Sequence, residues 1–297
     1  MAKDTGDALS PIEDHLSIPL KSIFFHEASC RGGLNSRQAC SVESAARAHP
    51  HWQINVLFSG PVTKDVLDNF SNLYALKQFL NIKFFRLHLL QYVKGTPVED
   101  FVRGGSLSRS WWPIQHTTEL LQLVTLFKRG GVCLDLDQLV TKSFEDLENN
   151  WMVRKSKKTL ASCPLSISKD PHGKAVIDSA LSEFGTYYKE DKWRYGSSVL
   201  LTSVLQKLCN TSNVTLMSAV RCQGFKVLNT EMFFPVRGFQ VKQYFAHKKL
   251  EVGNPYAHHF FDEITARLNV TPNSVYAKVA KKYCPTIYEI YGDKFGM

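Results

Sequence analysis

Two aspartates separated by one residue follow a short apolar run. Residues 132–136 read Val-Cys-Leu-Asp-Leu, and a second aspartate comes next. We expect a buried strand here, whose alternate side chains point the same way, so that Asp135 and Asp137 project together at its carboxyl end. Open α/β sheets bind ligands at that edge. Two converging carboxylates repel each other unless a cation lies between them, and a hard divalent ion there would bind a diphosphate on its far side.

The context of this pair is more informative than the pair itself, because Asp-x-Asp also occurs in many surface turns. Residues 117–128 carry apolar side chains at helical spacing, and Gly130 with Gly131 ends that helix. The order of helix, Gly-Gly, apolar strand and two acids favours a metal-binding pair over a solvated turn.

The surrounding elements follow the order of an α/β protein. Apolar runs predict strands at residues 22–26, 53–58 and 82–88. Helical patterns, the first with a Ser/Glu capping box, predict helices at residues 41–48, 66–80, 174–188 and 197–208. Alternating strands and helices indicate a mainly parallel sheet with crossover helices, whereas the chain beyond residue 151 is less regular and rich in aromatic loops.

The bulk composition limits the partners. The 297 residues carry a net charge of +9 and are 44% apolar, as in a globular protein with a substantial core. A basic balance fits nucleic acid, a nucleotide diphosphate or an anionic membrane surface. The basic residues are scattered and no nucleic-acid motif accompanies them, so we expect no nucleic-acid partner.

The sequence holds no run of about 18 apolar residues, and its first 19 residues are polar, so we expect neither a membrane span nor a signal peptide in it. Residues 1–20 are predicted to be flexible. Two cysteine pairs are spaced like the ends of short loops, although the sequence leaves the pairing open: Cys30 with Cys40, and Cys209 with Cys222. Glycosylation sequons begin at Asn210, Asn213 and Asn269. Together these features favour a secretory lumen.

Residues 116–144 resemble the donor-site segment of the α-1,4-glycosyltransferases, in which a helix precedes Gly-Gly-Ile-Tyr-x-Asp-x-Asp. Further stretches resemble that family in the same order: residues 40–50 (CSVESAARAHP), 231–245 (EMFFPVRGFQVKQYF), 256–259 (YAHH) and 283–286 (YCPT). The resemblance therefore covers nearly all of residues 20–290.

This resemblance implies an α/β fold of the GT-A type, with a Rossmann-like, mainly parallel sheet flanked by helices. Residues 21–150 would bind the donor, and a less regular half, residues 151–297, would bind the acceptor. It implies a UDP-sugar donor, Mn²⁺ or Mg²⁺ as cofactor, and α-1,4 transfer with retention to a glycan, such as that of a glycosphingolipid. It also implies a membrane-associated enzyme of the Golgi lumen.

The same resemblance suggests the site residues. The metal ligands would be Asp135, Asp137 and His259, the last matching a family histidine near the metal and diphosphate. The donor-binding set would be Glu119, Gly130, Gly131, Asp135 and Asp137. No nucleophile can be assigned, and Asp262 and Glu263 are the candidate catalytic acids because they closely follow His259.

Several neighbours of the aspartates depart from the family pattern. Gln122 stands where the family has an arginine, and it lacks the charge with which a guanidinium pairs with a carboxylate. The remaining departures are Cys133 for a tyrosine, Ala161-Ser162-Cys163 for a segment with Asn-Gly, and Ser197-Ser198 for Gly-Pro. An alternative is therefore a catalytically weak or inactive relative that binds nucleotide-sugar or glycan.

Overall fold

The structure is a computed structural model that describes residues 6–15, 17–69, 71–192, 197–247 and 250–297. Its strands are β1 (Ser22–Glu27), β2 (Gln53–Phe58), β3 (Ile82–Arg86), β4 (Gly131–Cys133), β5 (Gln138–Val140), β6 (Trp151–Arg154), β7 (Leu160–Ile167), β8 (Lys226–Leu228) and β9 (Ala257–His259). Its α-helices are α1 (Ser36–Ala48), α2 (Lys64–Asp68), α3 (Asn72–Lys77), α4 (Leu89–Tyr92), α5 (Glu99–Arg103), α6 (Pro113–Arg129), α7 (Pro171–Tyr187), α8 (Ser197–Leu208), α9 (Asp262–Thr265), α10 (Val275–Tyr283) and α11 (Pro285–Tyr291).

One mixed sheet of seven strands organises the molecule, in the order β3-β2-β1-β4-β7-β6-β8. The first four strands of this order are parallel to one another, whereas β7 runs antiparallel to both β4 and β6. Strands β5 and β9 form a separate antiparallel pair. The predicted α/β class with a mainly parallel sheet is confirmed, and the sheet continues across residue 150 into the second half.

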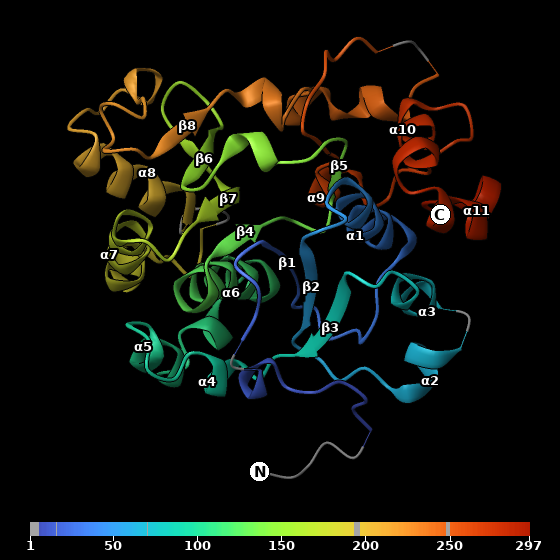
Figure 1. The fold of residues 1–297 in the computed structure, drawn as a ribbon, viewed down its shortest axis with the longest axis horizontal. Coiled ribbons are helices and arrows are strands. Elements are labelled where there is room, and N and C mark those ends of the chain that lie inside the picture. Colours follow the sequence, from blue (N-terminus) through green and yellow to red (C-terminus); the bar gives the residue numbers. More distant parts are fainter. Residues whose placement is uncertain (1–5, 16, 70, 193–196, 248–249) are drawn as a thin grey trace.

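Helices cover both faces of the sheet, with α6 and α7 to the left of β1 and β2 in Figure 1 and α1 and α3 to the right. Alternate side chains of β1 enter two different cores: Ile23 and Phe25 pack in the core that includes α1, and Phe24 packs in the core that includes α6. All three are fully buried. A strand covered on both faces needs apolar side chains on both, which explains the apolar run of residues 23–25 within β1.

The helix boundaries differ from the predictions where capping residues were misread. Helix α1 begins at Ser36, five residues earlier than expected, because Asn35 and Gln38 form the capping box: each side chain bonds the other's backbone N–H. The single helix predicted over residues 66–80 is wrong. The chain forms α2 and α3 instead, and the Ser71 hydroxyl caps α3 by accepting the N–H of Tyr74.

Two disulfides are present among the described residues. Cys209–Cys222 closes a short loop, as its spacing suggests. Cys40 pairs with Cys284, 244 residues away, rather than with Cys30, which is free and exposed. Helix α1 contacts α10 and α11, so the fold brings these two cysteines together from opposite ends of the chain.

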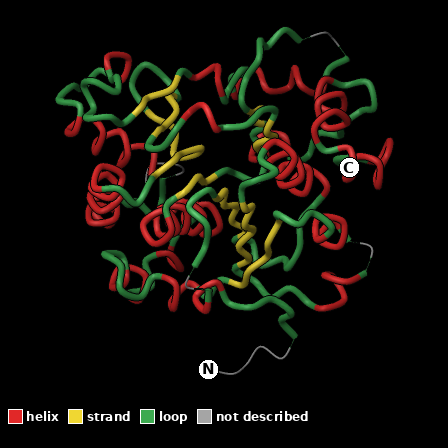
Figure 2. The backbone as a smooth tube through the Cα atoms, in the orientation of Figure 1, coloured by secondary structure: helices red, strands yellow, loops and turns green. Residues whose placement is uncertain are grey.

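The second half is less regular, as expected. Figure 2 shows long loops there, and between α8 and α10 the described residues form only short elements, namely β8, β9, α9 and 3-10 helices of up to eight residues. Within the segment expected to be flexible, Asp7 pairs with Arg86 at 2.8 Å and Ile12 is fully buried, whereas residues 1–5 and 16 lie outside the described residues. No helix of the described chain combines the length and hydropathy of a membrane-spanning segment.

Candidate active site

The two aspartates lie in a turn between β4 and β5. Strand β4 ends at Cys133, so the predicted strand over residues 132–136 is too long, and strand alternation is not what aligns the carboxylates. Gln138 fixes the turn instead. Its backbone N–H donates to the carbonyl of Asp135, and its side-chain oxygen accepts the N–H of Asp135, both at 3.1 Å. The turn still follows the carboxyl end of β4, where the sheet edge carries ligands in this fold class.

Pairing of β5 with β9 brings the predicted histidine to this turn. Gln138 lies opposite His259 in the antiparallel register. The Nε2 atom of His259 lies 3.7 Å from Asp135 Oδ2 and 3.4 Å from Asp137 Oδ1. One potential ligand atom from each of the three residues lies within 4.8 Å of the other two. The structure thus brings together the three residues that the resemblance suggested as metal ligands.

Each aspartate is oriented by a hydrogen bond from a different part of the chain. Gln122 Nε2 of α6 donates to Asp135 Oδ1 at 2.8 Å. The backbone N–H of Asp262 donates to Asp137 Oδ2 at 2.9 Å, and the N–H of Phe260 donates to the carbonyl of Asp137 at 3.0 Å. In each carboxylate, the oxygen that does not accept this bond is the one nearer to His259: Oδ2 of Asp135 and Oδ1 of Asp137.

The electrostatics of the two carboxylates differ. Burial raises the pKa of Asp135, but hydrogen bonding and charge from His259 and the bond from Gln122 outweigh it, so this pKa is lowered overall. Burial raises the pKa of Asp137, and repulsion from Asp135 adds to it despite the opposing charge of His259. A cation between the carboxylates would remove that repulsion, since it would favour both ionised forms.

A cavity of about 270 Å³ opens beside the three residues. Its lining includes five carboxyl side chains, those of Glu27, Asp135, Asp137, Asp262 and Glu263. The basic side chains in the lining are Arg31 and Lys155. A diphosphate entering this acidic cavity needs a compensating cation, because the carboxylates would otherwise repel it.

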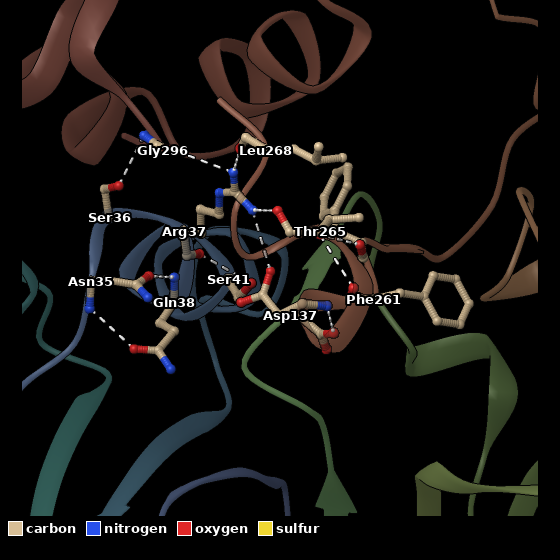
Figure 3. Close-up of polar contacts among 12 residues, drawn as sticks. Asn35, Ser36, Arg37, Gln38, Ser41, Asp137, Phe261, Thr265, Leu268 and Gly296 are labelled. Atoms are coloured by element: carbon tan, nitrogen blue, oxygen red, sulfur yellow. Dashed lines mark hydrogen bonds and ion pairs between the residues drawn. The ribbon is translucent and has the colours of Figure 1, made fainter. Parts of the chain in front are cut away.

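Both candidate acids lie at the cavity. Asp262 begins α9 directly after Phe261, whose backbone is left-handed (φ 52°), and Glu263 follows it. Burial and the charge of Asp137 raise the pKa of Asp262 to about 6, although the nearby Arg37 opposes this shift. Figure 3 shows Arg37 extending from the first turn of α1 between Thr265, Leu268 and Gly296.

The other predicted donor-binding residues lie away from the cavity lining. Glu119 is buried and accepts hydrogen bonds from the Ser197 hydroxyl (3.1 Å) and from Gln115, which itself lines the cavity. Gly130 and Gly131 lie at the opposite end of β4, where their positive φ angles (69° and 97°) turn the chain from α6 into the sheet.

The sequence reasoning missed three residues around the site. His26 and Glu27 end β1 and line the cavity; both are buried, and each has one side-chain atom without a hydrogen-bond partner, namely Nδ1 and Oε2. Burial lowers the pKa of His26 to about 3. Position at the carboxyl end of a predicted parallel strand is the signal that could have identified both. Arg37 gave no comparable signal, because the residues that pair with its guanidinium by hydrogen bonds and charge lie 225 or more residues away.

The residues that depart from the family pattern lie close to the aspartates or in the packing around them. Gln122 still reaches Asp135, and Ser162 and Cys163 line the cavity. The buried Cys133 thiol contacts the carbonyl of Gln122 at 3.6 Å. The Ser198 hydroxyl bonds the carbonyl of Leu160, on β7.

Comparison with known proteins agrees with this geometry. Residues 35–157 match the glycosyltransferase sugar-binding region containing the DXD motif, and residues 169–291 match the alpha 1,4-glycosyltransferase conserved region. Human lactosylceramide 4-alpha-galactosyltransferase is 28% identical over 278 residues, covering 90% of this chain and 76% of that protein. Human alpha-1,4-N-acetylglucosaminyltransferase is 22% identical, covering 90% of this chain and 80% of its own length.

Solved structures include a galactosyltransferase crystallised with donor and acceptor sugar analogues. It is 13% identical and has a TM-score of 0.43, covering 90% of this chain and 95% of the other. The two matched regions together span most of the chain. The aspartate turn lies in the first region and β9 and α9 lie in the second, so the site forms where the two regions meet. This chain is a glycosyltransferase that carries the DXD sugar-binding region and, after it, the alpha 1,4-glycosyltransferase conserved region.

Proposed function

We propose that this enzyme transfers a hexose or N-acetylhexosamine from a UDP-sugar to a glycan acceptor in α-1,4 linkage, with retention of anomeric configuration. The names of the relatives, one a lactosylceramide galactosyltransferase and the other an N-acetylglucosaminyltransferase, support these sugar classes and a glycosphingolipid acceptor. The observation that carries the proposal is the convergence of Asp135, Asp137 and His259 beside the cavity.

The proposed cofactor is a divalent ion held by these three residues. Asp135 and Asp137 would supply oxygen ligands and His259 a nitrogen ligand, while Gln122 and the amide of Asp262 keep the carboxylates oriented. One imidazole in the set favours Mn²⁺ over Mg²⁺, because Mg²⁺ prefers an octahedral shell of oxygens. When bound, the ion would stabilise the charge that develops on the leaving nucleotide diphosphate.

The proposed reaction needs no protein nucleophile. The acceptor hydroxyl would attack the anomeric carbon on the face from which the nucleotide departs, and the departing phosphate would accept the hydroxyl proton. Asp262 and Glu263 line the cavity and are the acids to test for a role in this proton transfer. Glu119 and the Gly130-Gly131 turn would act on the donor side only through the position of α6 and β4.

We place the enzyme in the Golgi lumen, in association with the membrane, as its family implies. Two disulfides and three exposed sequon asparagines, Asn210, Asn213 and Asn269, support a secretory compartment. The Asn213 side-chain oxygen already accepts the Thr215 N–H and hydroxyl within its sequon. The protein purified from its own cells should be shifted to lower mass by a peptide N-glycosidase, and an unchanged mass would contradict luminal passage.

The proposed activity is tested with a panel of UDP-sugars, with and without Mn²⁺. One UDP-sugar should raise the melting temperature only when Mn²⁺ is present and should release UDP when a lactose-terminated acceptor is added. Metal-dependent stabilisation without UDP release on any acceptor would instead support a binding-only protein. No stabilisation by any UDP-sugar would contradict the donor assignment.

A further inference from the structure

Arg37 is a buried cation that the proposed reaction does not use. It lies in the first turn of α1 and its side chain is 4% exposed. Its guanidinium donates to the carbonyls of Thr265 (2.9 Å), Leu268 and Gly296 (3.1 Å), as Figure 3 shows. Burying a guanidinium is costly unless its charge and its donors are matched, so this arrangement must be compensated.

The charge of Arg37 is matched by Asp262 of the cavity wall. Arg37 Nη1 lies 3.7 Å from Asp262 Oδ1, an oxygen that is buried and has no hydrogen-bond partner. The guanidinium is further enclosed by the rings of Phe245 and Tyr276, at 5.2 and 5.6 Å from their centroids. Its position is therefore fixed by contacts on several sides.

The segment that Arg37 holds is also the segment that holds Asp137. Asp262 donates its backbone N–H to the Asp137 carboxylate, and Phe260 donates to the Asp137 carbonyl. A continuous path thus runs from Arg37 through the Asp262 side chain and α9 to a proposed metal ligand. No residue on this path other than Asp137 is among the potential metal ligands.

We propose that Arg37 is a positioning residue of the transferase site, which neutralises Asp262 and clamps residues 260–268 so that the Asp262 amide orients the Asp137 carboxylate for the metal. This inference rests on the proposed metal site. Because the charges of Arg37 and Asp262 cancel, the carboxylates of Asp135 and Asp137 remain available to bind the divalent ion. Without Arg37, Asp262 would be an uncompensated buried carboxylate beside Asp137, which would displace one or both.

Arg37 could act by holding the segment in place or only through its charge, and these two roles predict opposite changes in Mn²⁺ binding when Arg37 is removed. If the guanidinium acted only through its charge, Arg37→Met would tighten cation binding, because a repelling charge would be lost. If it positions the segment, Arg37→Met weakens Mn²⁺ binding, by about tenfold for a loss of about 1.4 kcal/mol. Asp262→Asn also weakens binding, because it leaves the guanidinium unpaired near the ion. The double variant leaves no charge uncompensated but still lacks the bonds from Arg37 to the three carbonyls, so it should bind Mn²⁺ more tightly than Arg37→Met but less tightly than wild type.

The experiment measures the Mn²⁺ dissociation constant in the presence of UDP by electron paramagnetic resonance of free Mn²⁺, together with the melting temperature. Arg47→Met is the matched control: Arg47 lies on the same helix and pairs with Glu43 at 2.7 Å, away from the cavity, so Mn²⁺ binding should not change. If Arg37→Met does not fold, Asp262→Asn alone still has to weaken binding.

Three results would overturn the proposal. The first is unchanged or tighter Mn²⁺ binding in Arg37→Met at a lowered melting temperature, which would make Arg37 structural. The second is unchanged or tighter binding in Asp262→Asn. The third is a double variant that binds Mn²⁺ as tightly as wild type, which would mean that the bonds from Arg37 to the three carbonyls contribute nothing to positioning. Unchanged binding in Asp137→Ala would instead refute the metal site, and so separates that failure from this one.

Discussion

The two aspartates of the site are held by regions of contrasting origin. Asp135 is oriented by Gln122, 13 residues earlier in the chain, and its turn is closed by Gln138. Asp137 is oriented by residues 260–262, more than 120 residues later, which depend in turn on Arg37 of α1. We call residues 122–138 the local wall and residues 259–268 the distal wall. The local wall is built by neighbouring elements, whereas the distal wall exists only in the completed fold.

This contrast suggests that the two walls differ in stability. The local wall consists of the end of α6, strand β4 and the turn after it, and its apolar residues are buried in both cores. The distal wall is a short strand, a left-handed residue and a one-turn helix, held by side-chain contacts to α1. We therefore expect the proposed metal site to lose its distal wall first when the enzyme is destabilised.

The largest expected effect comes from removing the aspartate that joins the two walls. Asp137→Ala should lower metal-dependent turnover by about 1,000-fold or more, because a proposed oxygen ligand of the ion and the anchor for the Asp262 amide are lost together. Steady-state kinetics with the best donor measure this loss. Asp178→Ala, which removes an acid on the outer side of α7, should leave turnover unchanged. Full activity in Asp137→Ala would refute the assignment.

The disulfide between α1 and the start of α11 should stabilise the molecule more than the disulfide of the short loop. In the chain-entropy account, a loop of 244 residues contributes about 5 kcal/mol and one of 13 residues about 3 kcal/mol. Urea unfolding of C40S/C284S and C209S/C222S measures both. Equal losses, or a larger loss from the short loop, would contradict the larger contribution expected of the Cys40–Cys284 disulfide.

Stability should also fall at acidic pH. Burial lowers the pKa of His49 from 6.5 to about 4, so the unfolded chain binds a proton that the folded chain excludes between these values. The stabilisation is complete above pH 6.5 and is lost as the pH falls toward 4, by about 3 kcal/mol for this group. His26 and His258 shift in the same direction and add to the loss.

Urea unfolding at several pH values measures this loss. His49 accepts the Phe144 N–H and bonds the Ala45 carbonyl, so His49→Gln should be less stable at neutral pH but show a shallower decline. The exposed His172→Gln is the control and should keep the wild-type decline. A stability that stays constant down to pH 4 would contradict the buried neutral histidines.

The smallest effect is expected at the local wall. Gln122→Met removes one hydrogen bond to Asp135 and should weaken Mn²⁺ activation by about tenfold, because a bond to a charged group contributes about 1.5 kcal/mol. The melting temperature should change little, since α6 is packed by its apolar side chains. An effect as large as that of Asp137→Ala would mean that the turn closed by Gln138 cannot hold Asp135 in place without the bond from Gln122.

The local wall was largely predictable from the sequence. Local patterns gave β1, β2, α6 and the position of the aspartates, since each depends on residues close in the chain. The exact turn was not predictable, because β4 stops at Cys133 once Gln138 bonds back to Asp135. The single helix over residues 66–80 failed for a similar local reason, the cap at Ser71.

The distal wall was predictable only where a resemblance pointed to it. His259 was found in that way, whereas Arg37 lies in a helix whose first residues look like ordinary surface sequence. Its role depends on Asp262, Thr265 and Gly296, and no periodicity links residues so far apart. The partner of Cys40 was missed for the same reason, since contact between α1 and α10–α11 is a property of the fold.

The most direct test of the account is the location of the metal. Crystals grown with MnCl₂ and UDP should show an anomalous scattering peak at the manganese edge within roughly 2.5 Å of a ligand atom from each of Asp135, Asp137 and His259. The UDP phosphates should lie on its cavity side. A fully occupied UDP with no peak there, or with manganese bound elsewhere, would contradict the central claim.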